Sequence, residues 1–134
     1  MNTTSHFQIT PLLNVSRKGG ALFEFTPGTT CVRGPVDFVI EATDAYLTLE
    51  TAWTAGNKMG HDSVGRTYPM NWRSVSVGDI IEVIPHDGGD PIYYAVDRFG
   101  FKWVSPSDFE CVPTWWLEQA VETDDDLSLP YRNI

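Results

Sequence analysis

The segment Ser74–Trp103 constrains the fold of this chain more than any other part of the sequence. It holds two runs rich in β-branched and aromatic residues, Ile80–Ile84 and Ile92–Val96, and a third apolar run, Phe101–Val104. Gly, Pro and Asp residues, which favour turns, separate the runs. Strand-length runs joined by short turns are typical of consecutive antiparallel strands, so this segment predicts a three-stranded meander.

Two further strands are predicted nearer the N-terminus. Within His6–Leu13, the apolar Phe7 and Ile9 alternate with polar neighbours, which is the period of a half-buried strand. Ala21–Thr26 alternates in the same way and is bounded by glycine- and proline-containing turns.

The main helix is predicted between residues 35 and 57. Apolar or small residues recur there at intervals of three and four, which places them on one helical face: Val39, Ala42, Tyr46, Leu49 and Trp53. We favour a short strand over Val36–Ile40 followed by a helix from an Asp44 cap to Asn57. A helix that begins at Pro35 is the alternative. Leu49 and Trp53 are expected to be buried under the sheet.

The remaining segments predict one long loop and one short helix. Lys58–Arg73 has no clear period and exceeds the usual length of a connection, which is typical of functional or mobile loops. Ser105–Asp108 resembles a helix start, and Pro113–Val121 predicts a second helix. Residues from about 123 onward are acidic and are expected to fray.

Together these elements predict a single domain over residues 1–134 with an α+β fold. The sheet is expected to be small, mostly antiparallel and compatible with a barrel-like closure, with one long and one short helix packed against it. A chain of 134 residues is long enough to bury a core without disulfides or metals.

The charge of the chain excludes several partner classes. Nine Lys and Arg oppose eighteen Asp and Glu, giving a formal net charge of −9, and the basic residues do not cluster. Binding to nucleic acid or to an anionic membrane depends on such clusters, so neither is expected. A protein with a basic surface is the predicted partner.

The N-terminus and the cysteines point to the cytoplasm. The first residues are polar and predict no signal peptide, and no stretch reaches the ~20 apolar residues of a membrane span. We therefore expect a cytoplasmic protein in which Cys31 and Cys111 are reduced, buried and inert.

No pattern in the sequence predicts catalysis, a metal or a cofactor. The histidines His6, His61 and His86 have no His or Cys partner at a ligand spacing. Nucleophile-elbow and phosphate-loop patterns are missing, and Asp87 and Asp90 flank two glycines as turn formers usually do. The chain is therefore not expected to be an enzyme.

The C-terminal region combines tryptophans with acids. From Ser105 onward there are seven acids against one base. Adjacent residues of a helix point about 100° apart, so if Trp116 faces the core together with Ala120, then Trp115 is at least partly exposed. The predicted partner-binding residues are Trp115, Glu118, Glu122, Asp124, Asp125 and Asp126. The alternative is that both rings pack inside and the acids only keep the protein soluble.

The segment Arg73–Val83 (RSVSVGDIIEV), followed by Tyr93–Val96 and Phe99–Phe101, resembles the pattern of the YodL-like group. The resemblance covers roughly residues 49–104 and departs from the pattern at Ile80, where the group has Val. YodL-like proteins are small proteins of phages, plasmids and conjugative elements without an established activity. The resemblance implies a genomic setting, that of a phage or mobile element, more than a mechanism. We expect an accessory protein in the host cytoplasm that binds a host or rival protein, as a host-takeover or anti-defence inhibitor.

A second resemblance gives the alternative function. The entry into a strand through Val77-Gly78-Asp79 is similar to that of ASCH and PUA-like barrels. This implies a module that binds nucleic acid or a nucleotide, and the net charge of −9 argues against it.

Overall fold

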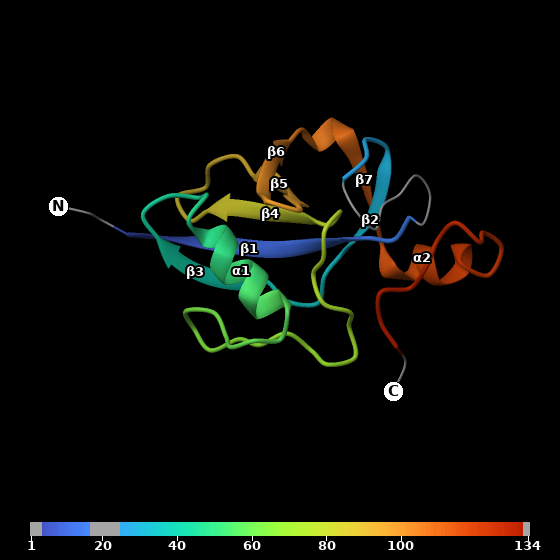
Figure 1. The fold of residues 1–134 in the computed structure, drawn as a ribbon, viewed down its shortest axis with the longest axis horizontal. Helices are drawn as coiled ribbons and strands as arrows, with labels where there is room; N and C mark the ends of the chain where they lie inside the picture. Colours follow the sequence, from blue (N-terminus) through green and yellow to red (C-terminus); the bar gives the residue numbers. More distant parts are fainter. Residues whose placement is uncertain (1–3, 17–24, 133–134) are drawn as a thin grey trace.

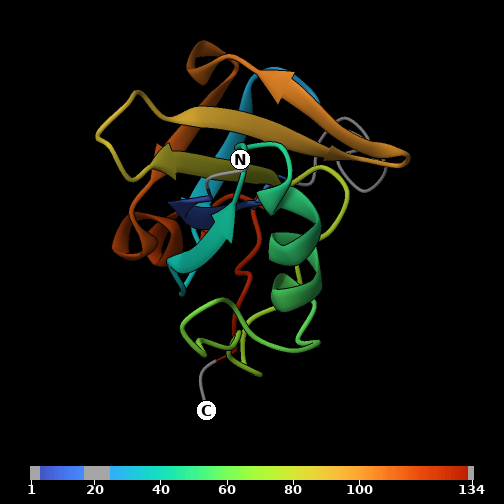
Figure 2. The same ribbon diagram turned by 90° about the vertical axis from the view of Figure 1, so that its left-hand side faces the viewer.

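The computed structural model describes residues 4–16 and 25–132, and these form an α+β fold. A curled, mixed sheet of seven strands is packed by helices (Figures 1 and 2). The strands are β1 (Ser5–Asn14), β2 (Thr29–Arg33), β3 (Phe38–Ala42), β4 (Ile80–Pro85), β5 (Ile92–Asp97), β6 (Gly100–Val104) and β7 (Phe109–Val112). The helices are α1 (Thr48–Gly56), the 3-10 helix η2 (Pro106–Asp108) and α2 (Thr114–Ala120). The predicted fold class is confirmed.

The long strand β1 organises the sheet. One edge of β1 pairs with β4, and the other edge pairs first with β3 and then with β2, all antiparallel. The meander β4–β5–β6 extends the sheet on one side. On the other side β7 pairs with β2 in parallel. The strand order is therefore β6-β5-β4-β1-β2-β7, with β3 beside β1.

Both faces of the sheet carry a hydrophobic core. The larger core lies on the face that α1 covers and includes Ile9, Phe38 and Leu49. The smaller core lies on the opposite face and contains Leu12, Cys31, Ile80, Ala95 and Val104. Because neighbouring residues of β1 enter different cores, this strand is buried on both faces from Ile9 to Asn14.

The predicted strand followed by a helix is confirmed, with a shift of the helix start. The carboxylate of Asp44 accepts a hydrogen bond from the Leu47 amide at 3.0 Å, and regular α-helix begins at Thr48. Val39 and Ala42, which share the helical spacing, belong to β3 because this segment pairs with β1, so the alternative of a helix from Pro35 is contradicted. Leu49 is fully buried, whereas Trp53 is only partly buried.

Two of the seven strands were not predicted. β2 and β7 have only five and four residues, which is too few to show a clear period. Their mutual pairing joins segments that are distant in sequence. The strand predicted over Ala21–Thr26 lies mostly outside the described residues, and Phe25 and Thr26 do not belong to a strand.

The C-terminal segment lies along the body, which corrects the expectation of a frayed tail from about residue 123. Leu127 forms a β-bridge with Ser16, and Tyr131 forms one with Trp72. The Arg73 amide also donates to the Pro130 carbonyl at 2.7 Å. The loop Lys58–Arg73 contains neither a helix nor a strand, as predicted, but it is held in part by this segment.

The described residues contain no helix that is both long enough and apolar enough to span a membrane.

We expect Leu49→Ala to destabilise the protein by about 2–5 kcal/mol, because it removes a fully buried side chain from the larger core. Met59→Ala, which truncates an exposed side chain, is the control and should change the free energy of unfolding by no more than about 0.5 kcal/mol. Urea denaturation of both variants measures the difference. Equal stability of the two would show that α1 does not pack on the core through Leu49.

Candidate functional site

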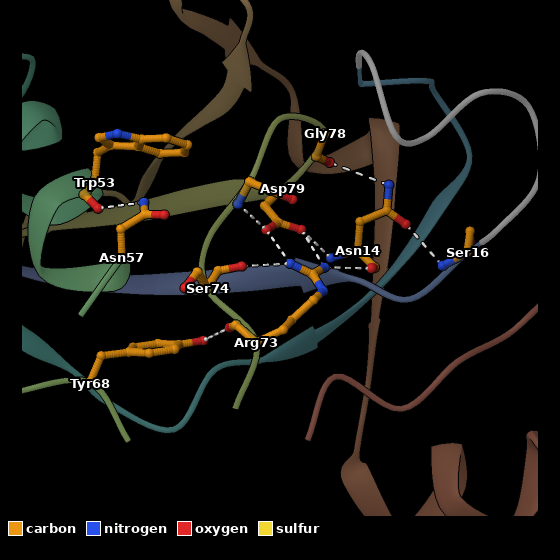
Figure 3. A network of polar contacts seen from close by, with 10 residues as sticks. Asn14, Ser16, Trp53, Asn57, Tyr68, Arg73, Ser74, Gly78 and Asp79 are labelled. Atoms are coloured by element: carbon orange, nitrogen blue, oxygen red, sulfur yellow. Dashed lines mark hydrogen bonds and ion pairs between the residues drawn. The ribbon is translucent and has the colours of Figure 1, made fainter. Parts of the chain in front are cut away.

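A buried ion pair holds the segment that resembles the YodL-like group (Figure 3). The guanidinium of Arg73 binds the carboxylate of Asp79 through two hydrogen bonds of 2.7 and 2.8 Å. The same carboxylate accepts hydrogen bonds from the amides of Asn14 and Ser76, both at 2.8 Å. Gly78 has a φ of +96°, a backbone conformation that favours glycine, and it turns the chain into β4 as predicted.

The polar groups around this ion pair form hydrogen bonds with one another. Arg73 also donates to the carbonyl of Asn14 at 2.8 Å, and the hydroxyl of Tyr68 donates to the carbonyl of Arg73 at 2.9 Å. Burial raises the pKa of Tyr68, and the nearby Asp79 raises it further. The side chain of Asp79 is only 1% exposed. The charged groups of Arg73 and Asp79 therefore bond to one another and to the main chain of the fold, which they stabilise.

The predicted partner-binding residues lie on and after α2, at the surface. The buried residue of the helix is Leu117, which enters the larger core. Trp116 is 40% exposed and Trp115 is 62% exposed. These values follow from the helical step of 100°, because Trp115 lies about 200° from Leu117. Trp115 is therefore exposed, although the condition from which its exposure was inferred, an inward-facing Trp116, does not hold. The alternative that both rings pack inside is contradicted.

The predicted acids are exposed except Asp126, which is half-buried. Glu118 lies one turn after Trp115 on the same side of the helix and accepts a hydrogen bond from the hydroxyl of Tyr131. Burial raises the pKa of Tyr131 to about 12, and the bond to Glu118 contributes. The other acids, Glu122, Asp124, Asp125 and Asp126, follow in the turn that leaves the helix.

Main-chain hydrogen bonds fix this acidic turn on both sides. The amide of Asp124 donates to the carbonyl of Ala120 at 2.9 Å, and the amide of Leu127 donates to the carbonyl of Asp124 at 3.3 Å. Ser128 then donates to Val15 of the sheet at 3.0 Å. The carboxylates are therefore carried on an ordered turn that is attached to the core at both ends.

A cleft of about 290 Å³ separates the acidic turn from the segment 26–30. Asp124 and Asp126 line one wall, and the hydroxyl residues Ser16, Thr26 and Thr29 line other parts of it. The cleft adds hydrogen-bonding groups to the edge of the exposed acidic surface.

A second buried carboxylate lies on the face of the sheet opposite α1. Arg33 donates to Glu82 Oε2 at 3.1 Å, and the Tyr93 hydroxyl donates to the same oxygen at 3.2 Å. Glu82 Oε1 lies 3.0 Å from the guanidinium of Arg33. Burial raises the pKa of Tyr93, and the neighbouring Glu82 raises it further. The buried Glu82 is thus paired with the half-exposed Arg33, and within the described residues its Oε1 accepts no hydrogen bond.

The cysteines lie on paired strands of the sheet, and two of the histidines lie together elsewhere. Cys31 and Cys111 face each other across the parallel pair β2–β7 as free thiols. Cys31 is buried as predicted, and burial raises its pKa, but Cys111 is exposed, which corrects the prediction for that residue. His6 and His86 are neighbours, with ring centroids 6.1 Å apart. Within the described residues, no group of three or more His, Cys, Asp or Glu is placed to hold a metal ion.

No protein-family model matches the chain, and no curated protein or solved structure matches it either. The resemblance to the YodL-like group therefore stays a prediction.

We expect Asp79→Asn to cost about 1–3 kcal/mol of stability, because the buried amide cannot accept all the hydrogen bonds that the carboxylate accepts. Asp87→Asn is the matched control, since Asp87 lies on an exposed turn and its amide form still accepts the hydrogen bond from Gly89. Thermal unfolding of both variants distinguishes them. A small, equal change in melting temperature would show that the ion pair does not stabilise the fold.

Proposed function

We propose that this chain is a phage or mobile-element accessory protein that acts in the host cytoplasm by binding a host or rival protein, as a host-takeover or anti-defence inhibitor. The observation that carries the binding function is the exposure of Trp115. This residue lies on a helix that packs on the core through the buried Leu117. An exposed tryptophan on a fixed element buries a large apolar area on contact at little conformational cost.

The acids beside this ring specify the chemistry of the partner. Carboxylates at the rim of an interface attract a basic surface and accelerate association, while the central ring supplies most of the affinity. The net charge of −9 favours the same kind of partner. The resemblance to the YodL-like group supports the genomic setting.

Affinity capture from a host lysate, followed by mass spectrometry, identifies the partner. Trp115→Ala should then weaken capture by at least about tenfold, the range of an interface anchor, while the melting temperature stays nearly unchanged. Retention of full binding by this variant and by the charge variant described next would place the interface elsewhere, and the loop Lys58–Arg73 is the next segment to test.

The triple variant Asp124→Asn, Asp125→Asn and Asp126→Asn should slow association, and the loss should shrink as the salt concentration rises. The matched control neutralises the same number of exposed acids elsewhere, through Asp87→Asn, Asp90→Asn and Glu110→Gln. Surface plasmon resonance with the captured partner measures both rates. An equal effect of the two triple variants would show that only total charge matters.

We expect no binding to duplex or single-stranded nucleic acid at physiological salt, because the chain lacks a basic cluster that could release counterions. Fluorescence anisotropy with labelled oligonucleotides tests this. A salt-sensitive rise in anisotropy at micromolar protein would instead support the ASCH or PUA-like alternative.

A further inference from the structure

The outer edge of β6 presents main-chain groups that the sheet does not use. β6 is the last strand on its side of the sheet (Figure 2). The amide and carbonyl of its neighbour Val96 are bonded toward β4, to Asp79 at 2.9 Å and to Gly78 at 3.0 Å. Val96 therefore makes no main-chain bond to its partner Phe101. By the same alternation, the N–H and C=O groups of Phe101 and Trp103 point away from the sheet.

The side chains of the same two residues belong to a partly exposed aromatic strip. The strip consists of Tyr46, Tyr94, Phe101 and Trp103. The ring of Tyr46 lies 5.9 Å from Tyr94 and 6.3 Å from Phe101, measured between centroids. Trp103 is 65% exposed and Tyr46 is 51% exposed. Free main-chain groups and an apolar surface thus occur at the same edge, which is the combination that strand addition uses.

We propose that β6 binds an extended segment of another protein as an added antiparallel strand. The segment pairs with the main chain of Phe101 and Trp103 and places an apolar side chain opposite each of them, on the aromatic strip. The residue of the added segment that lies between these two apolar residues is opposite Lys102. Lys102 is exposed on the opposite face of the sheet from the aromatic strip, so an acid fits at this position of the segment. The predicted sequence of the occupant is apolar–acidic–apolar.

A second copy of this chain is a poor occupant of the same edge. In the antiparallel register that overlaps the whole of β6, Lys102 of one copy lies directly opposite Lys102 of the other. Like charges at directly opposed positions are destabilising, and an exposed lysine on an edge strand is a known protection against self-pairing. Charge complementarity at Lys102 therefore favours a different chain that carries an acid.

The test is a titration of the isotope-labelled protein with a capped heptapeptide, Ser-Thr-Ile-Glu-Ile-Thr-Ser, followed by NMR. The amide signals of Phe101 and Trp103 should shift at millimolar peptide. A peptide with Lys in place of Glu should bind about threefold more weakly, as expected for one exposed charge pair. Lys102→Glu should reverse that preference.

Backbone methylation of the peptide separates strand pairing from simple apolar contact. N-methylation of both Ile residues removes the N–H groups that face β6 and should abolish binding. N-methylation of the central Glu removes an N–H that faces away and should leave binding intact. Equal binding of the two methylated peptides would overturn the proposal, and so would the absence of shifts at Phe101 and Trp103.

Two controls distinguish this inference from the proposed function. The inference rests on the proposed function only in that both treat the chain as a binding protein. Trp115→Ala should bind the heptapeptide normally, because α2 and the tip of the β5–β6 hairpin lie on different sides of the molecule (Figure 2). Sedimentation of the protein alone should show a monomer. Self-association that Lys102→Glu changes would assign the edge to a second copy and overturn the proposal.

Discussion

The ion pair between Arg73 and Asp79 is the interaction on which the rest of the structure depends. Its carboxylate is buried and joins three separate parts of the chain: the end of β1 at Asn14, the turn at Ser76, and the start of β4. A buried carboxylate needs a counter-charge and several donors, and all of them are supplied here. The ion pair therefore fixes the start of β4 beside the end of β1, at one end of the antiparallel ladder that joins the two strands and carries the meander.

Much of the sheet was predictable because its signals are local. The meander strands and β1 are marked by alternation and by turn residues, and the pairing of consecutive meander strands follows from the short turns between them. The pairing of β1 with β4 joins residues far apart in sequence, such as Phe7 and Pro85, and was not predicted. The parallel pair β2–β7 and the bridge between Ser16 and Leu127 join segments that are distant in sequence. Main-chain pairing of that kind leaves no periodic pattern, which is why β2, β7 and the attached C-terminal segment were missed.

The α2 surface was predictable only in part, for a geometric reason. In a run such as Trp115-Trp116-Leu117 each residue is apolar, and the helical step separates their directions by 100° without saying which direction is inward. The structure shows that Leu117 is inward. The aromatic strip at β6 was missed for a similar reason, because Tyr46 approaches Phe101 only after α1 is placed on the sheet. The residue types of both surfaces can be read from the sequence, but which side chains are exposed depends on how the elements pack.

The two surfaces require different things of a partner. The contact proposed at α2 is made by side chains on a short helix, so that partner needs a folded surface with a pocket for a ring and cations around it. The contact proposed at β6 is made by the main chain, and only an extended segment can satisfy N–H and C=O groups in a row. A compact basic surface does not meet the second requirement, and a short acidic strand does not meet the first. The two proposals therefore describe separate binding functions of one fold, and removing either surface should leave the other intact.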